Sequence, residues 1–250
     1  MNKIKLLIEH KIIRKILFLI FSVSYKLNFN SIFYSFFYLY ISIKKYYKIY
    51  ILGYDKKNKI VVTFWRQSFL KDQVELNKSK AINLIIIKPY VWATFTKVFY
   101  PKYMRGQISY HLFTDSNSLE IKKSAEEYVV QTLRKLQKKN LVDAFLVGNV
   151  DYMEHQSWGA AAKILNIPFV VMLCEGYFTK FWHQKFINQE HFMANTKFIY
   201  DKVFVPGTSA VLLANNANIA EKKDIVVTGY PRTDLSYSIF SKLNIENINK

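Results

Sequence analysis

Residues 141–176 constrain the fold more than any other part of the chain, because they combine two apolar runs with a helical pattern. The runs at 142–147 and 168–173 predict buried strands. Between them, one apolar face has the i, i+3, i+4, i+7 spacing of a helix, in the residues Trp158, Ala161, Ala162 and Leu165. Two strands joined by a helix form a parallel βαβ unit with a right-handed crossover. Ligands of such sheets bind beyond the carboxyl ends of the strands.

The rest of the chain continues this alternation of strands and helices. Four more apolar runs predict strands, at 60–65, 82–87, 202–205 and 224–228. The pattern at 118–139 predicts a long helix, with Ser118 as its N-cap and Asn140 in the left-handed turn that ends it. Residues 91–117 are aromatic and show no clear period. We therefore predict an α/β fold, a Rossmann-like open parallel sheet flanked by helices.

Residues 1–52 differ from the rest in being basic and rich in apolar and aromatic side chains. An uncharged run at 27–43 is close to the lower length limit for a membrane span. Three interpretations stay open: helices lying on an anionic membrane, helices packed in the core, or a spanning helix. We divide the chain into a helical, membrane-associated region at 1–52, a Rossmann-like domain at 53–236 and a linker at 237–250.

Charge and missing motifs narrow the range of functions. The formal net charge of +18 indicates an anionic partner, such as a membrane surface, nucleic acid or a phosphorylated molecule. No GxGxxG, P-loop, CxxC, HExxH or DxD motif occurs, so we predict neither a dinucleotide cofactor nor a bound metal. No helix-turn-helix or RNA-binding signature is present, and we predict no nucleic-acid partner. Cys174 is the single cysteine, which excludes an intramolecular disulfide.

Two acidic residues at predicted strand ends are candidates for a general base. Glu175 ends the second strand of the central unit, where burial raises the pKa of a carboxyl group and helps it to accept a proton from a hydroxyl. Asp151 follows the first strand of the unit. Its DYME context has the spacing of a capping box, which is a structural alternative to catalysis. Capping, or pairing with a lysine, is the corresponding alternative for Glu175.

Six further residues are candidates for binding the acceptor or an anion. Guanidinium groups form bidentate hydrogen bonds with phosphate, and backbone N–H groups at a helix start attract anions. The candidates follow predicted strands or begin predicted helices, and they are Arg66, Asn149, His155, Gly207, Thr208 and Arg232. A salt bridge is the structural alternative for either arginine. For His155, the alternative is a buried structural histidine that forms its hydrogen bonds within the core.

Three segments in a fixed order resemble the N-terminal half of GT-B-type glycosyltransferases. They are VDAFLVG at 142–148, AAAKILNIPFVVMLCE at 160–175, and the stretch 201–234, which closes with IVVTGYPRTD. The similarity is to bacterial surface-polysaccharide enzymes and to CDP-glycerol glycerophosphotransferases, and it covers roughly residues 60–235.

The resemblance implies that this domain binds a glycan or lipid-linked acceptor, while a second domain binds a nucleotide-activated sugar or CDP-glycerol as donor. It implies catalysis without a bound metal, in which Glu175 or Asp151 would deprotonate the acceptor hydroxyl. It also implies a peripheral position on the cytoplasmic face of the inner (cytoplasmic) membrane, held by residues 1–52.

The sequence ends soon after GYPRTD, so we expect the donor-binding domain or subunit to lie outside this chain, which would bind no cofactor itself. We therefore expect the acceptor half of a glycosyltransferase of envelope-polysaccharide biosynthesis. Two alternatives stay open. One is CDP-glycerol glycerophosphotransferase-like polymer synthesis, and the other is a non-catalytic membrane-bound subunit of a bipartite transferase.

Overall fold

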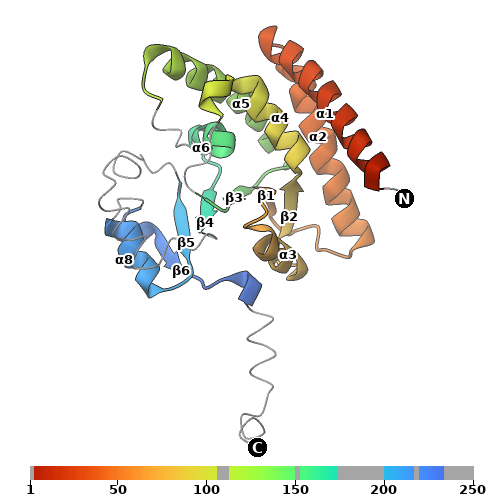
Figure 1. The fold of residues 1–250 in the computed structure, drawn as a ribbon. Coiled ribbons are helices and arrows are strands. Elements are labelled where there is room, and N and C mark those ends of the chain that lie inside the picture. The colour runs from red at the N-terminus through yellow and green to blue at the C-terminus, as the bar shows by residue number, and fades with distance from the viewer. Residues whose placement is uncertain (1–2, 106–112, 150–152, 174–199, 217–219, 234–250) are drawn as a thin grey trace, which may run out of the picture.

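The computed structural model describes residues 3–105, 113–149, 153–173, 200–216 and 220–233. Within these residues, six parallel strands form one open sheet in the order β2-β1-β3-β4-β5-β6. The strands are β1 (Ile60–Phe64), β2 (Asn83–Ile87), β3 (Ala144–Val147), β4 (Phe169–Met172), β5 (Lys202–Val205) and β6 (Ile225–Val227). All six predicted strands are confirmed, and so is the α/β class with a Rossmann-like parallel sheet (Figure 1).

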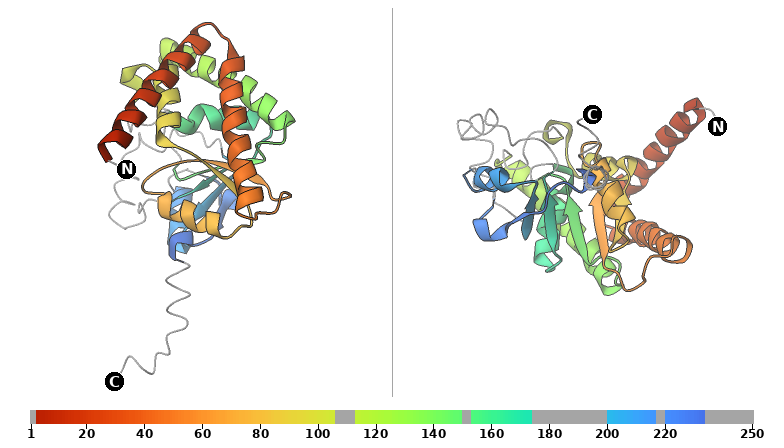
Figure 2. Two further views of the ribbon diagram at one scale, coloured as in Figure 1. Left: turned by 90° about the vertical axis from the view of Figure 1, so that its right-hand side faces the viewer. Right: turned by 90° about the horizontal axis from the view of Figure 1, so that it is seen from below.

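Helices lie between consecutive strands from β1 to β4 and between β5 and β6, and the described helices cover both faces of the sheet (Figure 1). The elements are α1 (Lys3–Lys26), α2 (Asn30–Tyr46), the π-helical turn η1 (Tyr47–Ile51), α3 (Leu70–Lys78), α4 (Pro89–Phe99), α5 (Ser116–Lys138), α6 (Met153–Ile164) and α8 (Thr208–Asn216). The described residues also include the short 3-10 turns η2 (Lys102–Met104), η4 (Lys222–Asp224) and η5 (Pro231–Thr233). Figures 1 and 2 show α1 and α2 as a V-shaped pair beside the β2 side of the sheet.

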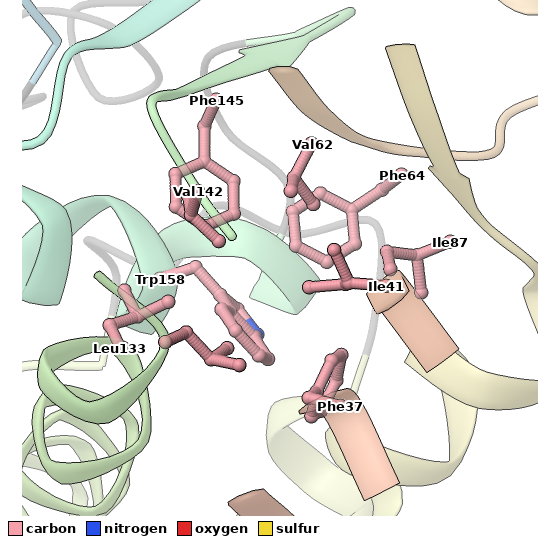
Figure 3. A pocket seen from close by; sticks show the side chains of 10 residues that line it. Phe37, Ile41, Val62, Phe64, Ile87, Leu133, Val142, Phe145 and Trp158 are labelled. Atoms are coloured by element: carbon pink, nitrogen blue, oxygen red, sulfur yellow. The ribbon is translucent and has the colours of Figure 1, made fainter. Parts of the chain in front are cut away.

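The main core lies between one face of the sheet and the helices α2, α4, α5 and α6. Its aromatic centre joins Phe37 of α2 and Trp158 of α6, whose ring centroids are 5.1 Å apart, to Phe64 and Phe145 on the strands. Figure 3 shows these side chains converging from the sheet and the helices. The space among them has no room for a water-sized molecule and no polar lining. It is a packed core, and a ligand cannot enter it without rearrangement.

The opposite face of the sheet has a smaller core under α3. Its buried members are Phe69, Leu84, Leu146 and Met172. Gln73 of α3 fixes the helix to β1, because its Nε2 donates to the Thr63 hydroxyl (2.9 Å) and to the Phe64 carbonyl (2.8 Å). This contact places the first turn of α3 beside the carboxyl end of β1.

The N-terminal helices share the main core, as one of the three interpretations of residues 1–52 requires. Phe33, Phe37 and Ile41 form a fully buried face of α2. Asn30 ties α2 to α5, because its Nδ2 donates to the Tyr128 carbonyl (2.9 Å) and to the Thr132 hydroxyl (2.8 Å). Among the described helices, none is both long enough and apolar enough to cross a membrane.

Several predicted helix boundaries shift. The long helix α5 begins at Ser116 and is capped by Asp115, whose carboxylate accepts from the Ser118 N–H (2.9 Å), so the prediction of Ser118 as N-cap is wrong. Residues 91–117, which showed no clear period, contain most of α4. Asn140 (φ 52°) takes the predicted left-handed turn.

Candidate anion-binding site at the carboxyl edge of the sheet

The strand order reverses beside β1, and this reversal defines the candidate site. The chain leaves β1 for β2 on one side of it and later enters β3 on its other side. Connections on the two sides diverge at such a switch point, and open α/β sheets bind their ligands in a crevice outside the carboxyl ends of the two strands, here β1 and β3. The residues that follow these two strands are Trp65 and Arg66 after β1, and Gly148 and Asn149 after β3.

Arg66 is half-buried at the end of β1, and α4 holds it in place. Its guanidinium carbon lies 4.8 Å from the ring centre of Trp92, in cation–π geometry. Trp92 is itself fixed, because its Nε1 donates to the Trp65 carbonyl (3.1 Å). The guanidinium therefore lies over a ring in the first turn of α4.

Asn149 and His155 meet at the end of β3. Asn149 is 6% exposed and His155 is 2% exposed. The His155 Nε2 lies 2.9 Å from the Asn149 carbonyl oxygen, which can only accept, so we assign the proton to Nε2. Burial, and secondly the charge of Arg66, lowers the pKa of His155 to about 3, against the opposing effect of the hydrogen bond to Asn149.

His155 is therefore neutral at physiological pH and orients the backbone at the strand end. The structure thus agrees with the structural alternative for His155, a buried histidine that forms its hydrogen bond within the core. Its low pKa makes it a poor proton acceptor near pH 7. In this structure, it acts on the site through its hydrogen bond to the Asn149 main chain, and the charge of Arg66 helps to keep it neutral.

The first turns of α6 carry a buried polar cluster that the sequence analysis missed. Gln156 Nε2 donates to the Tyr200 hydroxyl (3.0 Å), and the Tyr100 hydroxyl donates to the Ser157 hydroxyl (3.0 Å). With His155, three consecutive polar side chains are thus at most 2% exposed. The sequence signal was available: HQS is a polar run directly before the apolar positions of the same helix. The cluster fixes the start of α6 at the crevice.

Arg232 forms a salt bridge, which is the structural alternative raised for it. Its Nη2 lies 2.5 Å from Oδ2 of Asp72, and its backbone N–H and Nε donate to Oδ1 (3.0 and 3.1 Å). Asp72 is in the first turn of α3 and is fully buried. The contact joins residues 160 positions apart and holds η5 against α3. Asp72 balances the charge of this arginine.

Gly207 and Thr208 lie at the same edge of the sheet, after β5, which is two strands away from β3. Thr208 begins α8 and is exposed, and the Ala210 N–H donates to the Gly207 carbonyl (3.0 Å). The strand order separates this pair from the Arg66 crevice. The two candidate bases, Glu175 and Asp151, lie outside the described residues.

The site combines one stacked guanidinium, a strand-end amide and the start of a helix, all suited to an anionic or hydroxyl-bearing ligand. Among the described residues, no three His, Cys, Asp or Glu side chains come together as a metal site would require. Three of the six candidates, Arg66, Asn149 and His155, are brought together. Sequence reasoning placed Arg66 and Asn149 at strand ends and His155 in the first turns of the following helix, and the strand order makes the two strand ends adjacent.

Comparison with known proteins identifies no relative of this chain. No protein-family model, no curated protein and no solved structure matches the chain. The α/β class and the Rossmann-like parallel sheet therefore rest on the strand order, the strand directions and the helical crossovers of the chain itself.

Proposed function

We propose that this chain is the acceptor-binding half of a metal-independent GT-B-type glycosyltransferase of cell-envelope polysaccharide biosynthesis. The observation that supports this most is the convergence of Arg66, Asn149 and the start of α6 at the switch point of a parallel sheet. Crevices of this kind are where open α/β sheets bind their ligands. The resemblance of residues 142–148, 160–175 and 201–234 to GT-B acceptor domains suggests which class of ligand it is.

In this proposal, Arg66 binds a phosphate of a lipid-linked acceptor. A guanidinium fixed on Trp92 loses little rotamer freedom when it forms bidentate hydrogen bonds with phosphate oxygens. The partial positive charge at the start of α6 favours the same anion. Glu175 or Asp151 accepts the proton of the acceptor hydroxyl, and a second domain or subunit supplies the nucleotide-activated donor.

The surface of α2 and η1 supports a peripheral position on an anionic membrane. Large exposed side chains recur at intervals of seven, four, three and four residues and so form one stripe along the helix: Ile32, Leu39, Ile43, Tyr46 and Tyr50. We call this set the exposed stripe. Apolar and aromatic side chains of this kind insert into a membrane interface, and a chain with a net charge of +18 is attracted to anionic lipids.

A binding assay tests the acceptor proposal. The full chain is sedimented with anionic vesicles that contain or lack a polyprenyl diphosphate-linked saccharide. We expect tighter binding to the vesicles that contain it, and we expect Arg66→Gln to weaken this difference about tenfold, as the loss of a charge-assisted hydrogen bond would. Arg134→Gln, at an exposed position on α5, is the matched control for net charge. If both variants behave alike, or the saccharide lipid adds nothing, the proposal fails.

A further inference from the structure

A second cavity lies along the outer edge of β2, away from the Arg66 crevice. It has a volume of about 180 Å³ and lies between the end of α2, η1, the end of α3 and the edge strand. Three lysines line it, Lys44, Lys48 and Lys88, together with the polar side chains of Asn77 and Tyr47. The edge strand contributes Leu84, Ile85 and Ile86.

Lys48 is buried in the wall of this cavity and is held in a fixed position. Lys48 is only 7% exposed, and its ammonium group lies 4.1 Å from the ring centre of Tyr54. The ammonium donates to the side-chain oxygen of Asn77, while the Tyr54 hydroxyl donates to the Asn77 carbonyl. Burial, and secondly the nearby charge of Lys44, lowers the pKa of Lys48 to about 8.

The charge in this cavity is not balanced by its lining. None of the described residues that line it is acidic. The acidic side chains nearest in sequence are engaged elsewhere: Glu75 pairs with Lys78 (2.7 Å), and Asp55 accepts from the Lys57 N–H (2.8 Å). A buried ammonium beside two further lysines is costly unless an anion occupies the site.

We propose that this cavity binds a phosphate group, carried either by a lipid headgroup or by a soluble molecule. A phosphate monoester offers three terminal oxygens and more than one negative charge, so it matches a site lined by three ammonium groups more closely than a singly charged carboxylate does. The proposal does not depend on the glycosyltransferase assignment.

Two probes distinguish the sources of the phosphate. Inorganic phosphate is titrated into the full chain by calorimetry, and the chain is separately sedimented with phosphatidylcholine vesicles that contain or lack phosphatidic acid. Lys48→Gln tests the buried lysine, and Lys88→Gln tests an exposed one whose loss leaves the core intact. Lys45→Gln is the control, because Lys45 neighbours Lys44 but points its ammonium at the Asn140 carbonyl (3.5 Å) outside the cavity lining.

We expect Lys48→Gln and Lys88→Gln each to weaken phosphate binding about tenfold, while Lys45→Gln leaves it unchanged. If the lysine variants bind inorganic phosphate more weakly than the wild type does, a soluble phosphate is sufficient for binding. If they differ from the wild type only in binding to phosphatidic acid vesicles, the ligand is a lipid headgroup. The proposal is overturned if neither probe binds, or if Lys45→Gln weakens binding as much as Lys88→Gln does. Failure of the Arg66 assay would leave this result unaffected.

Discussion

His155 couples the start of α6 to the end of β3 only in its neutral form. The imidazole is 2% exposed, and protonation would place a charge in the core next to Arg66. Its pKa falls from 6.5 to about 3 for this reason. The unfolded chain therefore binds a proton at a higher pH than the folded chain does, and folding loses stability as the pH falls.

A pH series tests this account. The stability contributed by neutral His155 is fully present above pH 6.5 and is lost as the pH falls toward 3. We expect this residue to cost the folded state about 2 kcal/mol between pH 7 and pH 5, at roughly 1.4 kcal/mol per unit below the unfolded pKa. Urea unfolding of the wild type and of His155→Gln measures the difference. An unchanged pH dependence in the variant would show that another group is responsible.

The Asp72–Arg232 contact is the second residue-scale feature, because it buries a carboxylate completely. Arg232→Met would leave that carboxylate without its guanidinium. We expect a loss of roughly 2 kcal/mol in the free energy of unfolding, moderated because the Arg232 side chain is 26% exposed. Replacing both residues, as Asp72→Leu with Arg232→Met, should recover part of the loss.

Chemical denaturation measures these free energies, and Lys123→Met is the control. Lys123 forms an exposed ion pair with Glu127 on α5 at 4.0 Å, and exposed pairs of this kind contribute little. Equal effects of Arg232→Met and Lys123→Met would contradict a structural role for the buried pair.

At the scale of elements, the strands were predictable and the helix details were less so. The strands form continuous apolar runs, which local pattern reveals. The N-cap of α5 was misplaced because Asp115 and Ser118 are both acceptable capping residues, and only the observed bond to the Ser118 N–H selects Asp115. The α4 helix was missed because its apolar and aromatic side chains, such as Trp92 and Phe95, surround much of the helix and blur the period.

The exposed stripe of α2 and η1 could not be separated from the buried face by sequence, because both consist of large apolar side chains. Phe37 is 1% exposed, whereas Leu39 is 57% exposed. We expect the double substitution Leu39→Glu and Ile43→Glu to reduce sedimentation with phosphatidylglycerol vesicles while thermal unfolding stays close to that of the wild type. Leu119→Glu, at an exposed leucine of α5, should leave vesicle binding unchanged. Equal binding by all three proteins would contradict membrane contact through this stripe.

At the scale of the whole molecule, the N-terminal helices and the sheet share one core. Deleting residues 1–52 would remove Phe33, Phe37 and the hydrogen bonds of Asn30, and would expose the sheet face. A loss of membrane binding by this deletion variant could therefore result from unfolding as well as from the removal of the membrane-binding surface. Substitutions on the exposed stripe avoid this problem, because these side chains lie outside the core.

The topology of the sheet also explains how far the candidate site could be predicted. Arg66 and Asn149 could be placed at strand ends from sequence, but their proximity depends on the order β2-β1-β3, which local pattern does not contain. The Lys48 cavity depends on the packing of η1 against α3 and β2, which no local pattern in the sequence contains. Both features could not be predicted from sequence because both depend on contacts between residues that are distant in the chain.

Hydrogen exchange on membranes tests most directly the proposal that the acceptor binds beside Arg66, at the ends of β1 and β3. The full chain is bound to vesicles with and without a polyprenyl diphosphate-linked saccharide, and amide exchange is compared by mass spectrometry. The account predicts slower exchange at the ends of β1 and β3, in peptides containing Arg66 and Asn149, and no such change in Arg66→Gln. Protection confined to other parts of the chain, or the same protection in Arg66→Gln, would contradict it.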